Sequence, residues 1–245
     1  MEQINLDAGY FYGIGVFETI AIEEGMPIFL ERHLLRLSNA VKGLGIQNAD
    51  YEKMVNKTQV MDYLRKNPQK HGCLKITVSD QNLIFSVRDN NYTAEDYNRG
   101  FTVELSRVLR NETSPLTYFK TLSYADNILE KREAKKRGVD EPVFINTKGQ
   151  LTEGATTNVF LVKDGHILTP KLECGLLNGI MRSYILENYQ VSEDIILLEK
   201  VEESDEMFLT NSLLGIMPVK RFGGKVFSSR LKGEALLEEY KRYIV

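Results

Sequence analysis

The chain has 245 residues, which is enough for one large domain or two modest ones with their own hydrophobic cores. Its 31 basic and 34 acidic side chains give a formal net charge of −3, so no overall positive field attracts nucleic acid or anionic lipid. No apolar run reaches the roughly 18 residues of a membrane span, and residues 1–7 lack the pattern of a signal peptide. We therefore expect a cytoplasmic protein that binds neither nucleic acid nor a membrane.

The sequence indicates neither a metal site nor a disulfide. Cys73 and Cys174 lie far apart without a C-x-x-C motif, so buried free thiols are predicted. His33, His71 and His166 are scattered along the chain and form no ligand cluster with the cysteines. The prediction is a metal-free protein.

The first half of the chain is predicted to begin with a strand and a helix. Apolar residues after a Gly-x-Gly entry predict a strand over 13–22. Apolar side chains then recur at steps of four, three and four, which predicts a helix over about 31–42. Arg36 lies about 200° around that helix from Leu34, so it faces away from the apolar stripe. Taken alone, such an arginine is usually solvated.

Further elements follow before a polar linker. The pattern predicts a helix over 51–64, a hairpin of strands over 73–78 and 83–87, and a strand over 101–105. The run Arg-Asn-Glu-Thr-Ser-Pro, which begins at Arg110, is the best linker in the chain. The chain is therefore divided into a small N-terminal α/β domain at 1–110, a linker at 111–118 and a larger C-terminal domain at 119–245.

The second half is predicted to mix helices with short strands. The expected strands lie at 143–146, 158–162, 166–169, 195–198 and 207–210. The expected helices lie at about 124–137, at 179–189 and from Ser228 or Ser229 onward. The first of these helices is strongly charged, and such a run is usually a solvated face.

Three features of the second half together suit pyridoxal phosphate (PLP). Lys120 lies among aromatic and aliphatic residues, Glu153 follows it, and a helix opens on glycines within 175–182. A buried amine forms the Schiff base to this cofactor, a carboxylate partners its protonated pyridine nitrogen, and a helix N-terminus binds its phosphate. Taken singly, a lysine beside apolar residues usually lies along the surface with its charge in water. Only the combination indicates the cofactor.

Six segments, in order, resemble the class IV, fold-type IV PLP enzymes. This family includes branched-chain and D-amino acid aminotransferases and 4-amino-4-deoxychorismate lyase. The segments are 9–19, 33–37, 120–127, 153–160, 177–182 and 210–212. The resemblance implies an α+β fold of the D-amino acid aminotransferase type, with two α/β domains, the cofactor site between them, and a homodimer.

The resemblance also implies which residues bind the cofactor. Lys120 becomes the Schiff-base lysine and the catalytic proton shuttle, and Glu153 pairs with the pyridine nitrogen. Tyr124 donates to the phenolic oxygen of the ring, and Leu177 packs on the ring face. The phosphate is held by Arg36, by Ser212 and by the helix start at Gly179, Ile180 and Met181.

Substrate-binding residues are implied less completely. Three residues line the place where substrate enters: Tyr12, Phe17 and Thr157. The hairpin over 72–88 lacks the Arg-x-His pair with which D-amino acid aminotransferases bind the substrate carboxylate. Three basic candidates for that carboxylate stay open: Lys75, Arg88 and Arg107.

Segments 12–19, 178–182 and 210–214 look like those of the lyases within the family. The predicted reaction converts a small molecule, 4-amino-4-deoxychorismate, to pyruvate and 4-aminobenzoate, a folate precursor. The alternative is a branched-chain or D-amino acid aminotransferase of the same family. A non-catalytic binding protein on this scaffold is a third reading, against which the presence of Lys120, Glu153 and Arg36 speaks.

Overall fold

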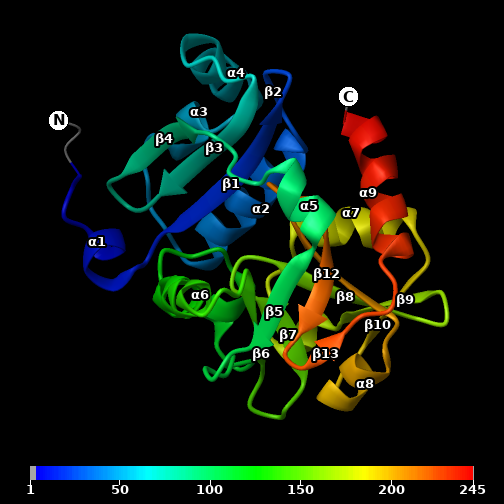
Figure 1. The fold of residues 1–245 in the computed structure, drawn as a ribbon. Coiled ribbons are helices and arrows are strands. Elements are labelled where there is room, and N and C mark those ends of the chain that lie inside the picture. The colour runs from blue at the N-terminus through cyan, green and yellow to red at the C-terminus, as the bar shows by residue number, and fades with distance from the viewer. Residues whose placement is uncertain (1–3, 245) are drawn as a thin grey trace. The chain divides into compact units, whose positions relative to one another are not determined.

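The computed structural model of the chain describes residues 4–244, which form two compact units (Figure 1). The first unit comprises the described residues up to Asn91, the strip 119–124 and Ile244. The second unit comprises 92–118 and 125–243. This division differs from the sequence-based one in two ways. The segment from Tyr92 to Tyr118, which includes the predicted linker, belongs to the second unit, and residues 119–124, with Lys120, belong to the first.

The first unit is built on a four-stranded antiparallel sheet in the order β2-β1-β3-β4. Its strands are β1 (Val16–Glu23), β2 (Met26–Pro27), β3 (His71–Val78) and β4 (Leu83–Arg88). The predicted first strand and the predicted hairpin are confirmed. Side chains alternate between the two faces of a strand, so Val16, Glu18 and Ile20 share one face of β1 and Phe17 lies on the other.

Four helices belong to the first unit. They are α1 (Ala8–Tyr12), α2 (Leu30–Gly43), α3 (Tyr51–Met54) and α4 (Lys57–Lys66). The predicted helix over 31–42 is confirmed as α2. The single helix predicted over 51–64 is wrong, because the chain breaks at Val55. The Asn56 side chain accepts the backbone N–H of Gln59 and thereby starts a new helix, α4.

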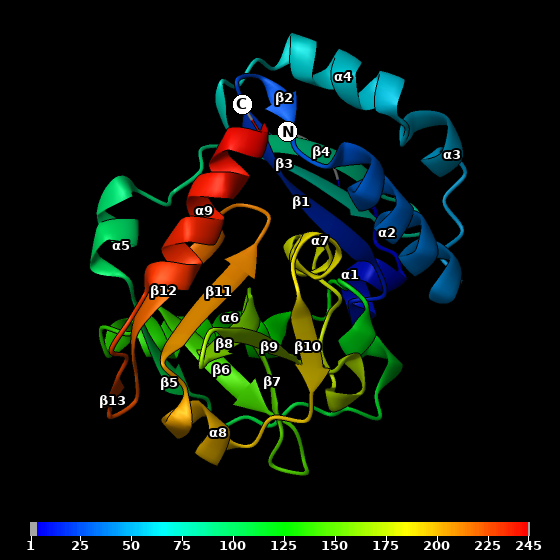
Figure 2. The same cartoon turned by 90° about the vertical axis from the view of Figure 1, so that its right-hand side faces the viewer.

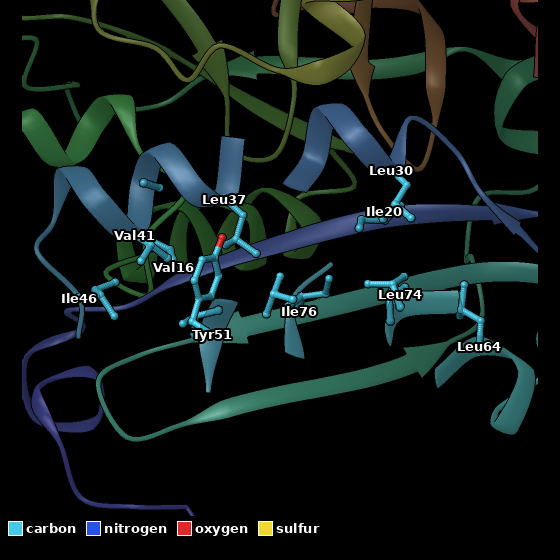
Figure 3. Packing of buried hydrophobic residues seen from close by; sticks show 14 of the residues in the cluster. Val16, Ile20, Leu30, Leu37, Val41, Ile46, Tyr51, Leu64, Leu74 and Ile76 are labelled. Atoms are coloured by element: carbon cyan, nitrogen blue, oxygen red, sulfur yellow. The ribbon is translucent and has the colours of Figure 1, made fainter. Parts of the chain in front are cut away.

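The core of the first unit lies between α2 and the sheet. Figure 3 shows Leu37 and Val41 of α2 gathered with Ile20 of β1 and Ile76 of β3. Tyr51 of α3 closes the same cluster, and each of these side chains is buried. Burial of this apolar stripe fixes the rotation of α2 about its own axis, and with it the direction of the polar side chains on the neighbouring turns.

The second unit contains a nine-stranded sheet that closes on itself. Six strands, β8, β11, β12, β5, β6 and β7, form a ring because β7 pairs with both β6 and β8. Their bounds are β5 (Phe101–Leu105), β6 (Glu141–Ile145), β7 (Leu151–Gly154), β8 (Asn158–Lys163), β11 (Glu206–Asn211) and β12 (Gly215–Phe222). The attached strands are β9 (His166–Pro170), β10 (Val191–Asp194) and β13 (Lys225–Val226).

Helices surround this ring. They are α5 (Ala94–Arg99), α6 (Ala125–Lys136), α7 (Ile180–Asn188), α8 (Leu198–Glu203) and α9 (Leu231–Ile244), with 3-10 turns at Pro115–Tyr118 and Leu172–Cys174. α6 packs on β6, and α7 packs against β11. Figure 2 shows α9 beside β11 and β12, where Gly215 leaves room for the Tyr240 ring.

Most predicted elements of the second half are confirmed, with one clear error. The predicted buried strand over 195–198 is wrong: Ile195 and Leu197 are half-exposed, and α8 begins at Leu198. The strand in this region is β10, which comes just before the predicted one, at Val191–Asp194. It pairs in parallel with β9 up to the last residue of β9, Pro170. Cys73 and Cys174 are buried and free, as predicted. No helix within residues 4–244 is both long and apolar enough to span a membrane.

Candidate active site

Lys120 lies in the strip 119–124, which runs along the start of β1 in the first unit. The Phe17 N–H donates to the Lys120 carbonyl oxygen at 2.9 Å, and the Leu122 N–H donates to the Gly15 oxygen at 2.8 Å. Glycine suits position 15, because a Cβ there would lie 2.9 Å from the backbone oxygen of Val78 as well as 2.6 Å from the Leu122 side chain. The backbone of Lys120 is therefore fixed by the first residues of the sheet.

Aromatic rings surround the Lys120 amine. Its Nζ lies 4.3 Å from the centroid of the Phe17 ring and 5.0 Å from that of Tyr124. The two rings meet edge to face with centroids 5.3 Å apart. The structure thus brings together three of the predicted site residues, and the rings provide an environment that attracts a cation through their π faces.

A second lysine shares the Phe17 ring. The Nζ of Lys75, on β3, lies 4.5 Å from its centroid. Lys75 is half-buried, and this burial lowers the pKa of its amine. By contrast Arg88 and Arg107, the other two candidates for a substrate carboxylate, are exposed.

Arg36 is held by a buried carboxylate that the sequence analysis did not single out. Glu18 accepts from Arg36 Nε and Nη2, each at 2.7 Å, and its Oε2 lies 2.7 Å from Nδ1 of His33. Burial by itself would raise the pKa of Glu18, but the charges of Arg36 and His33 and their hydrogen bonds together bring that pKa to about 2. Burial lowers the pKa of His33, which favours its neutral ring.

The second unit brings Glu153 and Leu177 together. Glu153 lies in β7, one residue before its end, with its side chain almost fully buried, and its Oε2 accepts the Leu177 N–H at 3.0 Å. Its other oxygen lies 3.3 Å from Nη2 of Arg110. Each oxygen of the Glu153 carboxylate therefore has a positively polarised group beside it, the Leu177 N–H or the Arg110 guanidinium.

The N-terminus of α7 has the character of an anion site. Gly179 is the N-cap residue of this nine-residue helix, and as a glycine it has no side chain with which to cap it. A Cβ on Gly179 would lie 2.0 Å from Asn158 Oδ1, so only glycine lets Asn158 approach and bind the Leu177 oxygen through Nδ2 at 2.9 Å. The uncapped N–H groups at Ile180 and Met181 fit a phosphate, and the buried Glu153 fits a pyridine nitrogen.

Arg182, in the first turn of α7, holds the segment before the helix in place. Its side chain is 1% exposed. Nη1 donates to Asn178 Oδ1 at 3.1 Å, and Nη2 donates to the Pro170 oxygen at 2.9 Å and to Glu193. The start of α7 is therefore tied to the ends of β9 and β10.

The remaining predicted residues lie in turns or at the surface. Thr157 is buried in the β7–β8 turn, where its hydroxyl donates to Glu141 at 3.1 Å. Ser212 lies in the β11–β12 turn, directly after Asn211, the last residue of β11, whose side chain donates to the Thr156 oxygen at 3.1 Å. Tyr12 ends α1 and is 74% exposed. The substrate and phosphate roles of these three residues stay predictions.

Three charged residues at the site escaped the sequence analysis: Glu18, Arg110 and Glu141. Glu18 could have been found from the strand pattern. It lies on the same strand face as Val16 and Ile20, and a carboxylate on a core-facing position needs a cation or a hydrogen-bond donor as its partner. Arg110 stands at the start of a polar run that predicts a linker. Nothing in the sequence pairs Glu141 with Lys131, because that contact joins β6 to α6.

Comparison with known proteins matches residues 15–222 to the family described as "Amino-transferase class IV". "Aminodeoxychorismate lyase" of Bacillus subtilis (strain 168) is 31% identical over 94% of this chain and 84% of its own length. A "Putative branched-chain-amino-acid aminotransferase" of Methanocaldococcus jannaschii is 30% identical over 96% of this chain and 88% of its own.

A solved structure is similar over nearly the whole chain. It is a "Putative 4-amino-4-deoxychorismate lyase" from Legionella pneumophila subsp. pneumophila str. Philadelphia 1, with a TM-score of 0.89 and 26% identity. The match covers 99% of this chain and 96% of that one. It confirms the predicted fold class.

Proposed function

Since the chain belongs to the class IV aminotransferases, enzymes that depend on PLP, we propose that it is a lyase acting on 4-amino-4-deoxychorismate. The products are 4-aminobenzoate, a folate precursor, and pyruvate. The observation that carries the proposal is the segment 178–182 at the start of α7, which looks like the lyase form of the phosphate helix. The similarity to the Bacillus and Legionella proteins, in sequence and in fold, supports it.

The predicted site residues have the chemistry to hold the cofactor. Lys120 supplies the amine, Glu153 the carboxylate for the pyridine nitrogen, and the start of α7, Arg36 and Ser212 the groups for the phosphate. Bound PLP supplies an electron sink that stabilises negative charge on the carbon next to the substrate nitrogen. Arg36 is suited to its part because Glu18 fixes its guanidinium before any ligand arrives.

Lys120 moves the proton in the proposed reaction. It takes the proton from the ring carbon that bears the amino group, and the C–O bond to the enol-pyruvyl group breaks. The proton equivalent returns to the departing group, which leaves as pyruvate, while the ring becomes aromatic. Phe17 and Tyr124 pack beside the amine, and such apolar walls exclude water from a proton transfer of this kind.

Lys75 is the best placed of the three candidates for a substrate carboxylate. It lies on the same face of the sheet as Phe17, over the ring that Lys120 also approaches. Arg88 and Arg107 are exposed, so a bound carboxylate there would stay in water, where an ion pair contributes little. We assign the carboxylate to Lys75 within this proposal.

The second candidate function is an aminotransferase for branched-chain or D-amino acids. The Methanocaldococcus relative favours it, because its identity to this chain is close to that of the Bacillus lyase. The two functions share Lys120 and the cofactor groups, and they differ in whether a keto acid is needed to accept the amino group.

A single-substrate assay tests the proposal. Purified protein loaded with PLP is given 4-amino-4-deoxychorismate without any keto acid, and pyruvate is followed by a coupled dehydrogenase. We expect pyruvate and 4-aminobenzoate in equal amounts, and none from the Lys120→Ala variant. Absence of pyruvate together with exchange of amino groups between alanine and a keto acid would overturn the lyase in favour of the aminotransferase.

A further inference from the structure

Arg110 is a largely buried arginine in a stretch whose sequence predicts a linker. Its backbone N–H donates to the Ile145 oxygen at 2.9 Å, and it forms an isolated parallel bridge with Asn146. The side chain is 12% exposed. The residue therefore extends the pairing beyond the end of β6 and directs a guanidinium into the second unit.

Three contacts set the plane of that guanidinium. Its Cζ lies 4.0 Å from the centroid of the Phe144 ring. Nη1 donates to Asn127 Oδ1 at 3.0 Å, and Asn127 in turn donates to the Ala155 oxygen at 2.6 Å. Nη2 lies 3.3 Å from Glu153 Oε1. Ring stacking and one hydrogen bond thus hold the cation beside the carboxylate.

The contact to Glu153 is electrostatic. Among the described residues, neither Nε nor Nη2 of Arg110 has a hydrogen-bond partner, although both atoms are buried. If Arg110 served only to stabilise the fold, it would be expected to use its donors more fully, because an unmade bond to a buried donor is costly. The arrangement instead places a fixed positive charge 3.3 Å from Glu153 Oε1.

A charged carboxylate is what a pyridine nitrogen requires. Burial disfavours the charged form of Glu153, whereas a cation within 4 Å and a backbone N–H on the other oxygen favour it. If Glu153 were neutral, it would not stabilise a protonated ring nitrogen.

We propose that Arg110 is the positioning residue for the cofactor's ring nitrogen: it holds Glu153 charged and aimed for that nitrogen without touching the cofactor. Arginine suits this task better than lysine, because its planar cation stacks on Phe144 and keeps its charge when buried. The proposal uses the family's cofactor and the assigned role of Glu153, and it does not depend on which reaction the enzyme catalyses.

A binding cycle tests it. The dissociation constants of PLP, and of its analogue in which a CH group replaces the ring nitrogen, are measured for wild type, Arg110→Gln and Glu153→Gln. We expect Arg110→Gln to weaken PLP on the order of 10-fold, the scale of outer partners of a bound group, and to leave the analogue nearly unchanged. Glu153→Gln is expected to show the same pattern, and Arg110→Lys to recover only part of the loss.

The analogue separates positioning from a structural role. An equal loss of affinity for PLP and for the analogue in Arg110→Gln would overturn the proposal, and so would no loss for either ligand. The matched control is Arg132→Gln on the exposed face of α6, which removes the same charge and is expected to bind both ligands as wild type does. Because the readout is binding, a failure of the lyase assay leaves this test intact.

Discussion

At the scale of single residues, the arginine proposed for the phosphate is fixed by its neighbour on β1. Glu18 faces α2 because it shares a strand face with Val16 and Ile20. Arg36 projects from α2 to meet it with two parallel hydrogen bonds. Periodicity placed Arg36 off the apolar stripe, but it could not name its partner, because Glu18 comes 18 residues earlier on another element.

Glu18 makes stability depend on pH in the acid range. Its folded pKa of about 2 lies below its ordinary value of 4.5, so the pair stabilises the protein above about pH 4.5 and loses that effect as the pH falls toward 2. We expect Glu18→Gln to lower the free energy of unfolding at pH 7 by about 3 kcal/mol, because it leaves the largely covered Arg36 guanidinium beside a neutral amide. Urea unfolding from pH 7 to pH 3 measures both effects. The wild-type advantage should shrink toward pH 3, and a constant difference would contradict the titration.

Gly179 matters because it has no Cβ, which lets Asn158 lie close to the backbone at the start of α7. We expect Gly179→Ala to weaken PLP binding by on the order of 10-fold, because the new Cβ would lie 2.0 Å from Asn158 Oδ1 and displace the turn that presents the start of α7. Equilibrium titration with PLP measures the loss. Gly224→Ala is the matched control, since its Cβ would meet nothing within 4 Å. Equal affinities in the two variants would show that the turn adapts.

At the scale of elements, α6 shows what a charge pattern cannot reveal. Its charged run predicts a solvated face, and Lys135 and Lys136 are indeed exposed. Lys131, however, reaches Glu141 at 2.8 Å and the Thr156 hydroxyl at 2.7 Å. Asn127, one helical turn earlier, holds the Ala155 oxygen. One face of α6 therefore clamps the β7–β8 turn, and only the position of β6 decides which charged face that is.

Breaking that clamp should be costly. Glu141 is fully buried and accepts the Thr156 N–H at 2.6 Å as well as the Lys131 ammonium. We expect Lys131→Met to lower the free energy of unfolding by about 3 kcal/mol, because it leaves a buried carboxylate without its cation. Lys135→Met, on the exposed face of the same helix, should change it by less than about 0.5 kcal/mol. Denaturant unfolding of both variants compares them, and similar stabilities would show that Glu141 needs no counter-charge.

At the scale of the whole molecule, local elements were predictable and long-range pairing was not. The β3–β4 hairpin was predicted because its strands are joined by a short polar turn at 79–82. Strand β12 was not predicted, because a proline in the middle of a segment, here Pro218, is unfavourable in a central strand. In the structure Pro218 nevertheless pairs with Phe208 of β11 inside the ring. β5 was predicted as a strand, but its parallel partners, β6 and β12, are distant in sequence and no local pattern identifies them.

We also propose a homodimer, as the family resemblance implies. Six large apolar side chains between residues 4 and 14 are exposed: Ile4, Leu6, Tyr10, Phe11, Tyr12 and Ile14. Apolar surface gathered in one segment is typical of an interface. Light scattering at micromolar concentration should give twice the 28.0 kDa of one chain.

The double variant Leu6→Glu, Phe11→Glu tests this surface. We expect it to give the mass of a single chain, because two charges would have to be buried on association. Met26→Glu, at another exposed apolar side chain of the first unit, should leave the dimer intact. A wild-type protein that is monomeric at this concentration would contradict the proposal.

The closed ring of the second unit also restricts aggregation of native chains through pairing of strand edges. Every one of its six strands has a neighbour on both sides, so none offers a row of unpaired amides as a template for a foreign strand. Within residues 4–244, the strands with a neighbour on one side only are β2, β4, β10 and β13. The longest of these edge strands is β4, with six residues. Fibril-like growth, if it starts from the native state, is therefore directed to the outer border of the small sheet, where Arg88 ends the strand with a charge.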